Sequence, residues 1–282
     1  MKKLNVLIAS LFVSSCCLSL TSCQDSEYVI SVCASEQPHK EILEGVVADI
    51  LSEKGYELKV SVLDWTLQND AVANNEYDAN YFQHVPYLNT YQGKKPLAAA
   101  CKVHYEKLCV YSKDTSDKTI DNGDVIEIVN DISNVERALN LLASNNILSI
   151  NESCYENGEF KNFNVNNPMG SVTFLEGYED CELKCIKESL LCQSLSDVDF
   201  GVIPGNTAMT GFPNDYKDRI CFGEEDEKLI DERANIIAVK KENLTSPKTL
   251  ALVEALKDQR VEDYISASYG ETVVYHYVDL TK

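Results

Sequence analysis

The chain has 282 residues, of which 44% are hydrophobic, and its 45 acidic and 25 basic side chains give a formal net charge of −20. This length and hydrophobic content predict a folded globular protein with a sizeable core. The excess of acidic side chains argues against partners with a phosphate backbone, so no nucleic acid is expected, and against docking on anionic lipid by charge alone.

The start of the chain has the features of a secretory leader. Lys2 and Lys3 give a positive beginning, the apolar stretch LNVLIASLFV follows, and LTSC ends at Cys23. This resembles the lipobox of bacterial lipoproteins and predicts a signal peptide at 1–22, a lipidated Cys23 and a polar tether at 23–27. We therefore expect a bacterial protein held by lipid on the extracytoplasmic face of the cell membrane. An ordinary cleaved signal remains an alternative, as does an uncleaved anchor, although the apolar run is short for a spanning helix.

Alternating strand and helix patterns follow the tether. The hydrophobic spacing predicts strands at 28–34, 56–64 and 77–82, and helices at 39–55 and 67–76. Another strand is expected at 106–112, after which the polar segment KDTSDKTIDNGD indicates a boundary near residue 113.

The middle of the chain repeats this alternation. Strands are predicted at 125–131, 171–177 and 197–205, and helices at 134–144 and 181–195. A strand at 234–242 then leads to a helix with Ser246 as its N-cap and Pro247 in its first position, and a final helix ends at Gly270.

This order of elements predicts an α/β fold of two lobes joined by two crossings. Residues 28–112 and 222–282 would form lobe 1, and residues 113–221 would form lobe 2. Each lobe is expected to contain a mixed, largely parallel sheet clad by helices, with binding crevices at the carboxyl ends of strands.

Eight cysteines follow Cys23, and their spacing is irregular. An even number in an exported protein permits disulfides, but a chain of this length can also bury them as free thiols. Zinc ligation by Cys181, Cys185 and Cys192 is a further possibility, but their spacing fits no closed Cys/His set, so no metal is expected. The absence of a nucleophile elbow, an HExxH motif and a phosphate-binding Gly-rich loop leaves no positive sign of an enzyme or of a cofactor.

Four stretches together carry a family resemblance. They are PHKEILE at 38–44, NNEYDANYFQHVPYLNTY at 74–91, VNDISNVERAL at 129–139 and SPKTLALVEALKDQRVEDYISASYGETVV at 246–274. The chain from about residue 28 to 275 resembles the methionine-binding lipoproteins of the NlpA/MetQ type, the substrate-binding components of methionine ABC importers. The resemblance implies a bilobal periplasmic-binding-protein-like fold, whose cleft closes on one amino acid and which delivers it to a permease and ATPase complex.

The segment DISNVERAL gives this expectation a physical basis. Ser133 as N-cap and Glu136 three residues later would form a capping box, which starts a helix at about Asn134. Arg137 would then lie in the first turn, where a guanidinium beside a helix N-terminus can grip a carboxylate through two parallel hydrogen bonds. The resemblance implies that Arg137 and Asn134 hold the carboxylate end of the ligand. The alternative for Arg137 is a surface residue on the polar face of the helix.

The segment at 78–91 follows neither a clean strand pattern nor a clean helix pattern. Pro86 fits the first turn of a helix entered from a strand, which places Phe82, His84 and Tyr87 around a strand-to-helix junction. Aromatic rings there would suit a flexible, polarisable thioether side chain. The alternative is that Phe82 and Tyr87 are core residues and that His84 is a satisfied polar group.

Two other positions complete the expected binding site, and several positions depart from the family pattern. Trp65 stands where the family has a pocket tyrosine, and Asn206 matches an asparagine that contacts ligand. Besides Trp65, the departures are Gln68, Ile132, Pro204, Thr207 and a longer stretch between Asn167 and Asp197. They leave several ligands open: L-methionine, D-methionine, a methionine derivative or a methionine-containing dipeptide. A surface lipoprotein with an altered ligand or an adhesin role remains the alternative function.

Overall fold

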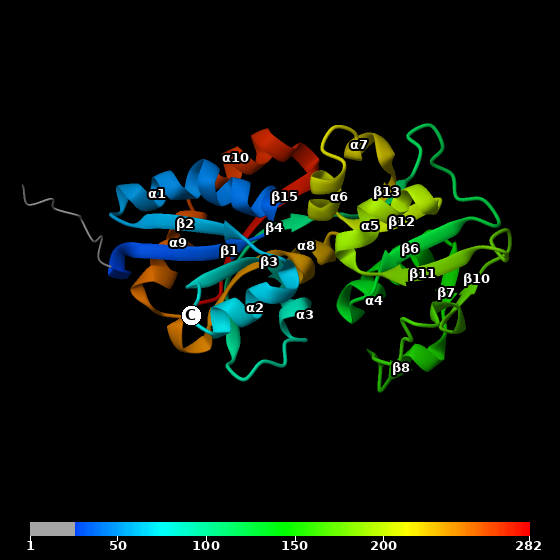
Figure 1. Ribbon diagram of the computed structural model, residues 1–282, viewed down its shortest axis with the longest axis horizontal. Coiled ribbons are helices and arrows are strands. Elements are labelled where there is room, and N and C mark those ends of the chain that lie inside the picture. Colours follow the sequence, from blue (N-terminus) through cyan, green and yellow to red (C-terminus); the bar gives the residue numbers. More distant parts are fainter. Residues whose placement is uncertain (1–25) are drawn as a thin grey trace, which may run out of the picture.

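The computed structural model describes residues 26–282. The predicted signal peptide, Cys23 and most of the predicted tether lie outside this range. The described chain forms two α/β lobes that lie side by side along the long axis of the molecule, each built on its own mixed sheet (Figure 1). Within this range no helix has the length and apolar character needed to cross a bilayer.

The first lobe contains a six-stranded sheet in the order β15-β4-β14-β3-β1-β2. Its strands are β1 (Val29–Ala34), β2 (Glu57–Val62), β3 (Ala79–His84), β4 (Leu97–Glu106), β14 (Asn235–Lys240) and β15 (Val273–Asp279). Only the β3-β1 and β1-β2 pairs are parallel, and the three remaining pairs are antiparallel. The sheet is therefore mixed, as predicted, but the expectation that it is largely parallel is wrong for this lobe.

Helices cover both faces of this sheet because successive strand side chains point to opposite sides. Ile30, Val32 and Ala34 of β1 pack in the main core of the lobe, whereas Cys33 packs in a smaller cluster with residues of α2. The helical segments of this lobe are η1 (Ser26–Tyr28), η2 (Glu36–Lys40), η3 (Leu43–Val47), α1 (Ala48–Glu53), α2 (Trp65–Ala73), α3 (Val85–Leu88), η7 (Lys241–Asn243), α9 (Pro247–Leu256), α10 (Gln259–Tyr269) and η8 (Gly270–Thr272).

The second lobe contains a five-stranded sheet in the order β11-β6-β12-β5-β13. Its strands are β5 (Leu108–Ser112), β6 (Val125–Val129), β11 (Glu182–Ile186), β12 (Phe200–Pro204) and β13 (Ile220–Gly223). Two short pairs lie beside it: β7 (Leu148–Ile150) with β10 (Val172–Phe174), and β8 (Tyr155–Glu156) with β9 (Glu159–Phe160).

Both faces of the second sheet are also covered. Leu108 and Val110 of β5 belong to a core that includes α4, whereas Cys109 and Tyr111 pack on the other side with residues of α5 and α6. The helical segments are α4 (Ile132–Ser144), η4 (Glu152–Cys154), η5 (Pro168–Gly170), α5 (Glu188–Ser194), η6 (Leu195–Asp197), α6 (Gly205–Gly211) and α7 (Tyr216–Arg219).

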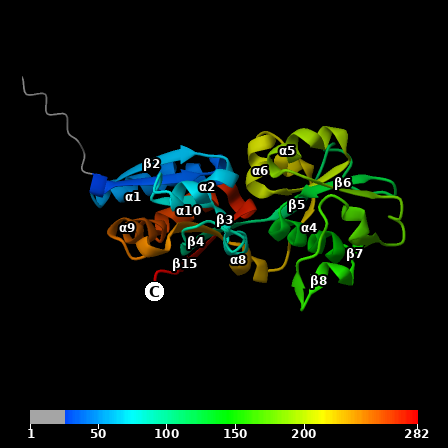
Figure 2. The same ribbon diagram turned by 60° about the horizontal axis from the view of Figure 1, so that its bottom comes forward.

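The chain passes between the two sheets twice. The first crossing is at Lys107, between β4 and β5, and the second spans residues 224–234, which include α8 (Lys228–Arg233). Figure 2 shows α8 between the two lobes. The predicted boundaries at 112 and 222 place β5 in lobe 1 and divide β13 between the lobes, but both strands pair within the five-stranded sheet.

Several predicted elements differ from the structure. The strands β4 and β15 were not anticipated, and the helix expected at 181–195 is instead the strand β11 followed by the short helix α5. The final helices agree well: Ser246 caps α9 by accepting a hydrogen bond from the backbone N–H of Thr249, and α10 ends at Gly270, whose φ is +60°. A positive φ at the end of a helix favours glycine.

The eight described cysteines are all free thiols, and five of them are buried. The three cysteines that were considered for zinc binding do not form a cluster of metal-ligand type in residues 26–282. Burial raises the pKa of the Cys185 and Cys192 thiols to about 12, which disfavours the thiolate needed for metal binding.

Candidate functional site

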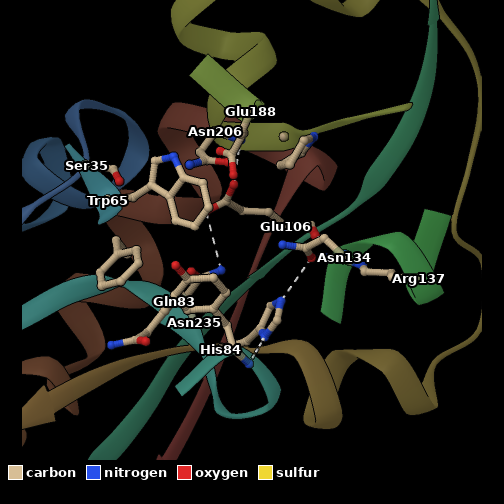
Figure 3. A pocket seen from close by; sticks show the side chains of 14 residues that line it. Ser35, Trp65, Gln83, His84, Glu106, Asn134, Arg137, Glu188, Asn206 and Asn235 are labelled. Atoms are coloured by element: carbon tan, nitrogen blue, oxygen red, sulfur yellow. Dashed lines mark hydrogen bonds between the residues drawn. The ribbon is translucent and has the colours of Figure 1, made fainter. Parts of the chain in front are cut away.

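A cavity lies between the lobes, close to the two crossings, and has a volume of about 50 Å³. The strands β3, β4 and β12 reach it with their carboxyl ends, where α3 and α6 begin. Figure 3 shows the side chains that line it: Ser35, Trp65, Phe82, Gln83, His84, Tyr87, Glu106, Asn134, Arg137, Glu188, Pro204, Gly205, Asn206 and Asn235. Both lobes contribute, so this site is complete only when the lobes are close together.

The seven residues singled out in the sequence as ligand contacts all line this one cavity. The first lobe supplies four of them and the second lobe supplies three. They are Trp65, Phe82, His84 and Tyr87 from the first lobe, and Asn134, Arg137 and Asn206 from the second. Their contact with a ligand stays a prediction.

Three aromatic rings form one wall of the cavity. The ring of Tyr87 lies between those of Trp65 and Phe82, with centroid distances of 5.2 and 5.7 Å and edge-to-face geometry in both pairs. Phe82 is buried, whereas Trp65 and Tyr87 are half-buried. Edge-to-face contacts fix these rings relative to one another, so the wall is preformed.

The strand-to-helix junction forms as the sequence predicted. Pro86 lies in the first turn of α3, and His84 caps this helix by accepting a hydrogen bond at Nδ1 from the backbone N–H of Tyr87 at 3.1 Å. The neighbouring nitrogen of His84, Nε2, must then carry the proton that it donates to Oδ1 of Asn134 at 3.2 Å. This bond joins the two lobes across the cavity.

His84 is a neutral side chain at physiological pH. Burial lowers its pKa to about 3, and the positive charges of Arg137 and Arg233 act in the same direction. It is therefore a satisfied polar group, as the alternative interpretation held, and it also lines the cavity.

The helix α4 begins earlier than predicted. Asp131, not Ser133, is its N-cap, and the Asp131 carboxylate accepts a hydrogen bond from the backbone N–H of Asn134 at 3.1 Å. Because the helix starts at Ile132, Arg137 lies in its second turn. An aspartate cap satisfies the free N–H groups of the first turn as well as the predicted serine would.

Arg137 is buried, with 7% of its side chain exposed, so it is not a surface residue. Its Nε donates to one oxygen of the Glu224 carboxylate at 2.6 Å, and its Nη2 donates to the other at 2.5 Å. Nη2 also donates to the backbone carbonyl of Glu106 at 2.8 Å. The paired hydrogen bonds expected for a ligand carboxylate are thus made to Glu224.

Sequence reasoning missed several polar residues of the cavity. Glu106 is the most connected of them: one carboxylate oxygen accepts from Nε2 of His104 at 2.7 Å, and the other accepts from the backbone N–H of Asn206 at 2.6 Å. Asn235 lies beside it, with Nδ2 3.5 Å from the Glu106 carboxylate. The only local signal was an asparagine directly before the apolar run IIAV of β14, whereas β4 gives no clear strand pattern that would single out Glu106.

Glu106 belongs to a buried polar cluster with His39 and His104, whose ligand atoms lie within 4.8 Å of one another. The same atoms are engaged in hydrogen bonds, because Nε2 of His39 lies 3.1 Å from Oδ1 of Asn235 and Nδ1 of His104 is bonded to the hydroxyl of Tyr81. Burial lowers the pKa of His39 to about 4 and that of His104 to about 3. The cluster forms a hydrogen-bond network of neutral imidazoles around one carboxyl group, in which Nδ1 of His39 has no hydrogen-bond partner among the described residues.

Solved and curated proteins share this architecture. A methionine-binding lipoprotein of Bacillus subtilis is 31% identical over 269 residues, which cover 93% of each chain. A nutrient-binding protein from Burkholderia cenocepacia, solved with methionine bound, superposes with a TM-score of 0.76 at 25% identity, covering 87% of this chain and 99% of the other. A periplasmic substrate-binding protein of an ABC transporter from Coxiella burnetii has the same fold, with a TM-score of 0.74 at 23% identity, and the match covers 88% of this chain and 100% of the other.

The model of the NlpA lipoprotein family matches residues 30–276 of this chain. This range includes both lobes, both crossings and every residue that lines the cavity. The chain therefore belongs to the NlpA lipoprotein family.

Proposed function

We propose that this chain is the lipid-anchored substrate-binding protein of an ABC importer, and that it captures methionine or a close relative in the interlobe cavity. The proposal rests on one observation. An aromatic wall and a buried polar end line the same cavity between the two lobes. Such a lining suits a small amphipathic zwitterion, because rings can contact its apolar tail and buried amides can bind its polar head.

The roles of the lining residues follow from their contacts. Trp65, Phe82 and Tyr87 would surround the side chain of the ligand. The carboxylate would meet the guanidinium of Arg137, with Asn134 on the same helix, and the amides of Asn206 and Asn235 would add polar contacts. No lining residue has to make or break a bond in this function, and capture followed by release to a permease and ATPase complex is its whole cycle.

The name of the Bacillus relative and the ligand of the Burkholderia structure support methionine as the ligand. Its lipoprotein relatives also support attachment through a lipid at Cys23. Isothermal titration of the full chain in detergent, after refolding to remove bound ligand, tests the proposal. L-methionine should bind with measurable heat, and a lack of binding to L-methionine, D-methionine and methionine-containing dipeptides would contradict it.

Replacing Tyr87 with alanine should weaken methionine binding by about 10- to 100-fold, because the central ring of the aromatic wall is lost. Titration calorimetry measures this change. Tyr91→Ala is the matched control, since this ring is half-buried outside the cavity and its hydroxyl donates to Asp70 on the surface. Equal affinities for the Tyr87 and Tyr91 variants would remove the aromatic wall from the binding site.

A further inference from the structure

Glu188 is a cavity residue to which the proposed function has given no role. It is the first residue of α5, and it lines both the cavity and an adjoining groove of about 260 Å³. Ser35, Trp65 and Asn206 also line both spaces, so Glu188 lies where the cavity meets the groove. Figure 3 shows Glu188 next to Asn206, on a different side of the cavity from Arg137.

The carboxylate of Glu188 has one hydrogen-bond partner. Its Oε1 accepts from the hydroxyl of Thr207 at 2.5 Å, whereas Oε2 has no partner in the described part of the chain. No lysine, arginine or histidine among residues 26–282 forms a salt bridge with it. A half-buried carboxylate in a ligand cavity is therefore left without a positive charge opposite it.

The charged groups that face Glu188 are acidic. Asp131 before α4, Glu106 at the end of β4 and Asp64 before α2 all add negative charge around it. The phenol of Tyr87 and the thiol of Cys192 are the other titratable groups nearby, and the pKa of each is raised, so both are neutral at pH 7. Arg137 does not compensate this charge, because Glu224 neutralises it.

This environment penalises the charged form of Glu188. Burial raises its pKa to about 7, the hydroxyl of Thr207 acts in the opposite direction, and the three carboxylates raise the pKa further. A cation placed at Oε2 would remove this penalty. The structure thus contains an acidic position that the protein itself leaves open for a positive group.

We propose that Glu188 binds the ammonium group of the ligand, and that it thereby makes the cavity select free amino acids over relatives whose amino group is missing or acylated. The inference rests on the proposed function, because it assigns the second charged end of the same zwitterion. The carboxylate of the ligand would lie toward Arg137 and its ammonium group toward Glu188, while the side chain contacts the aromatic wall.

Proton linkage follows from this arrangement. An ammonium group beside Glu188 lowers the carboxyl pKa, so the complex holds fewer protons than the free protein near pH 7. Binding at pH 7 should release roughly half a proton, because a group with a pKa near 7 is half protonated there. The affinity should rise as the pH increases from 5.5 to about 8, and it should fall at higher pH as the ammonium group of the ligand loses its proton.

The experiment compares two ligands on four proteins by titration calorimetry, with the full chain in detergent. The ligands are L-methionine and 4-(methylthio)butanoate, which has the same tail and carboxylate but no amino group. The proteins are the wild type, Glu188→Gln and Glu182→Gln, the last being a control on β11 with an exposed side chain. Glu188→Asp is added because it keeps the charge on a shorter side chain.

The wild type should prefer L-methionine by about 30-fold or more, and Glu188→Gln should bind L-methionine about 10- to 100-fold more weakly. The same substitution should leave binding of 4-(methylthio)butanoate within about threefold of the wild type, and it should abolish proton release. Glu188→Asp should recover part of the preference, and Glu182→Gln should behave as the wild type.

An equal effect of Glu188→Gln on both ligands would overturn the inference and leave the proposed function intact, as would an unchanged affinity for L-methionine. A wild type that binds neither ligand would contradict both the inference and the proposed function. Circular dichroism of each variant confirms that it is folded before titration.

Discussion

Replacing Arg137 with alanine is expected to lower the free energy of unfolding by about 3–5 kcal/mol. The substitution leaves the Glu224 carboxylate buried without its counter-charge. Among residues 26–282, this carboxylate then keeps only the hydroxyl of Tyr105 and the backbone N–H of Leu108 as donors. Urea unfolding of the ligand-free full chain at pH 7 measures the loss.

A second variant tests whether the loss of stability comes from the unpaired charge of Glu224. The double substitution Arg137→Met with Glu224→Leu removes both charges together, and it should cost less than Arg137→Ala alone because no unpaired charge stays buried. Arg260→Ala serves as control, since that arginine forms ion pairs on the surface and its removal should leave the urea midpoint unchanged. A wild-type midpoint for Arg137→Ala would show that the ion pair is not buried in solution.

This ion pair illustrates how far the sequence could predict the site. The local pattern correctly placed Arg137 on a helix near a cavity, because capping and helical spacing are local signals. Its partner Glu224 is 87 positions away and follows a strand of the same lobe. No periodicity in the sequence relates two such positions. The ion pair between Arg137 and Glu224 could therefore not be predicted from the sequence.

The missed strands have a similar cause. The strand β4 reads LAAACKVHYE, in which small residues and buried polar ones replace the alternation of β-branched and polar residues that identifies a strand. Its burial comes from its position between β14 and β15, which the local sequence does not encode. The helix predicted at 181–195 was wrong for the opposite reason. The leucines of α5 continue a helical spacing back across β11, so the pattern predicts one helix where the structure has a strand and a short helix.

Glu106 and Glu224 lie at the two points where the chain passes between the lobes. Glu106 ends β4 directly before Lys107, and Glu224 follows β13 at the start of the second crossing. Each carboxylate accepts hydrogen bonds from both lobes: Glu106 from His104 and Asn206, and Glu224 from Tyr105 and Arg137. The closed arrangement around the cavity is therefore held by two buried acceptors, one at each crossing.

Replacing Glu106 with alanine should consequently lower the free energy of unfolding by about 2–5 kcal/mol, because two buried donors lose their acceptor. These donors are Nε2 of His104 and the backbone N–H of Asn206, at 2.7 and 2.6 Å from the carboxylate. Methionine binding should weaken as well, since the bond to Asn206 joins the lobes that enclose the ligand. Urea unfolding and titration calorimetry on the same samples measure both effects.

The variant Glu106→Gln distinguishes the loss of the hydrogen-bond acceptor from the loss of its negative charge. Glutamine keeps one oxygen that can satisfy one of the two donors, but its amide nitrogen faces the other donor, so its loss of stability should lie between the wild type and Glu106→Ala. Glu57→Ala, on the half-buried strand β2 of the same lobe, should leave both measurements unchanged. If Glu106→Ala unfolds at the wild-type urea concentration and binds methionine normally, the lobes are held together by other contacts, and the crossing carboxylates lose the role assigned to them.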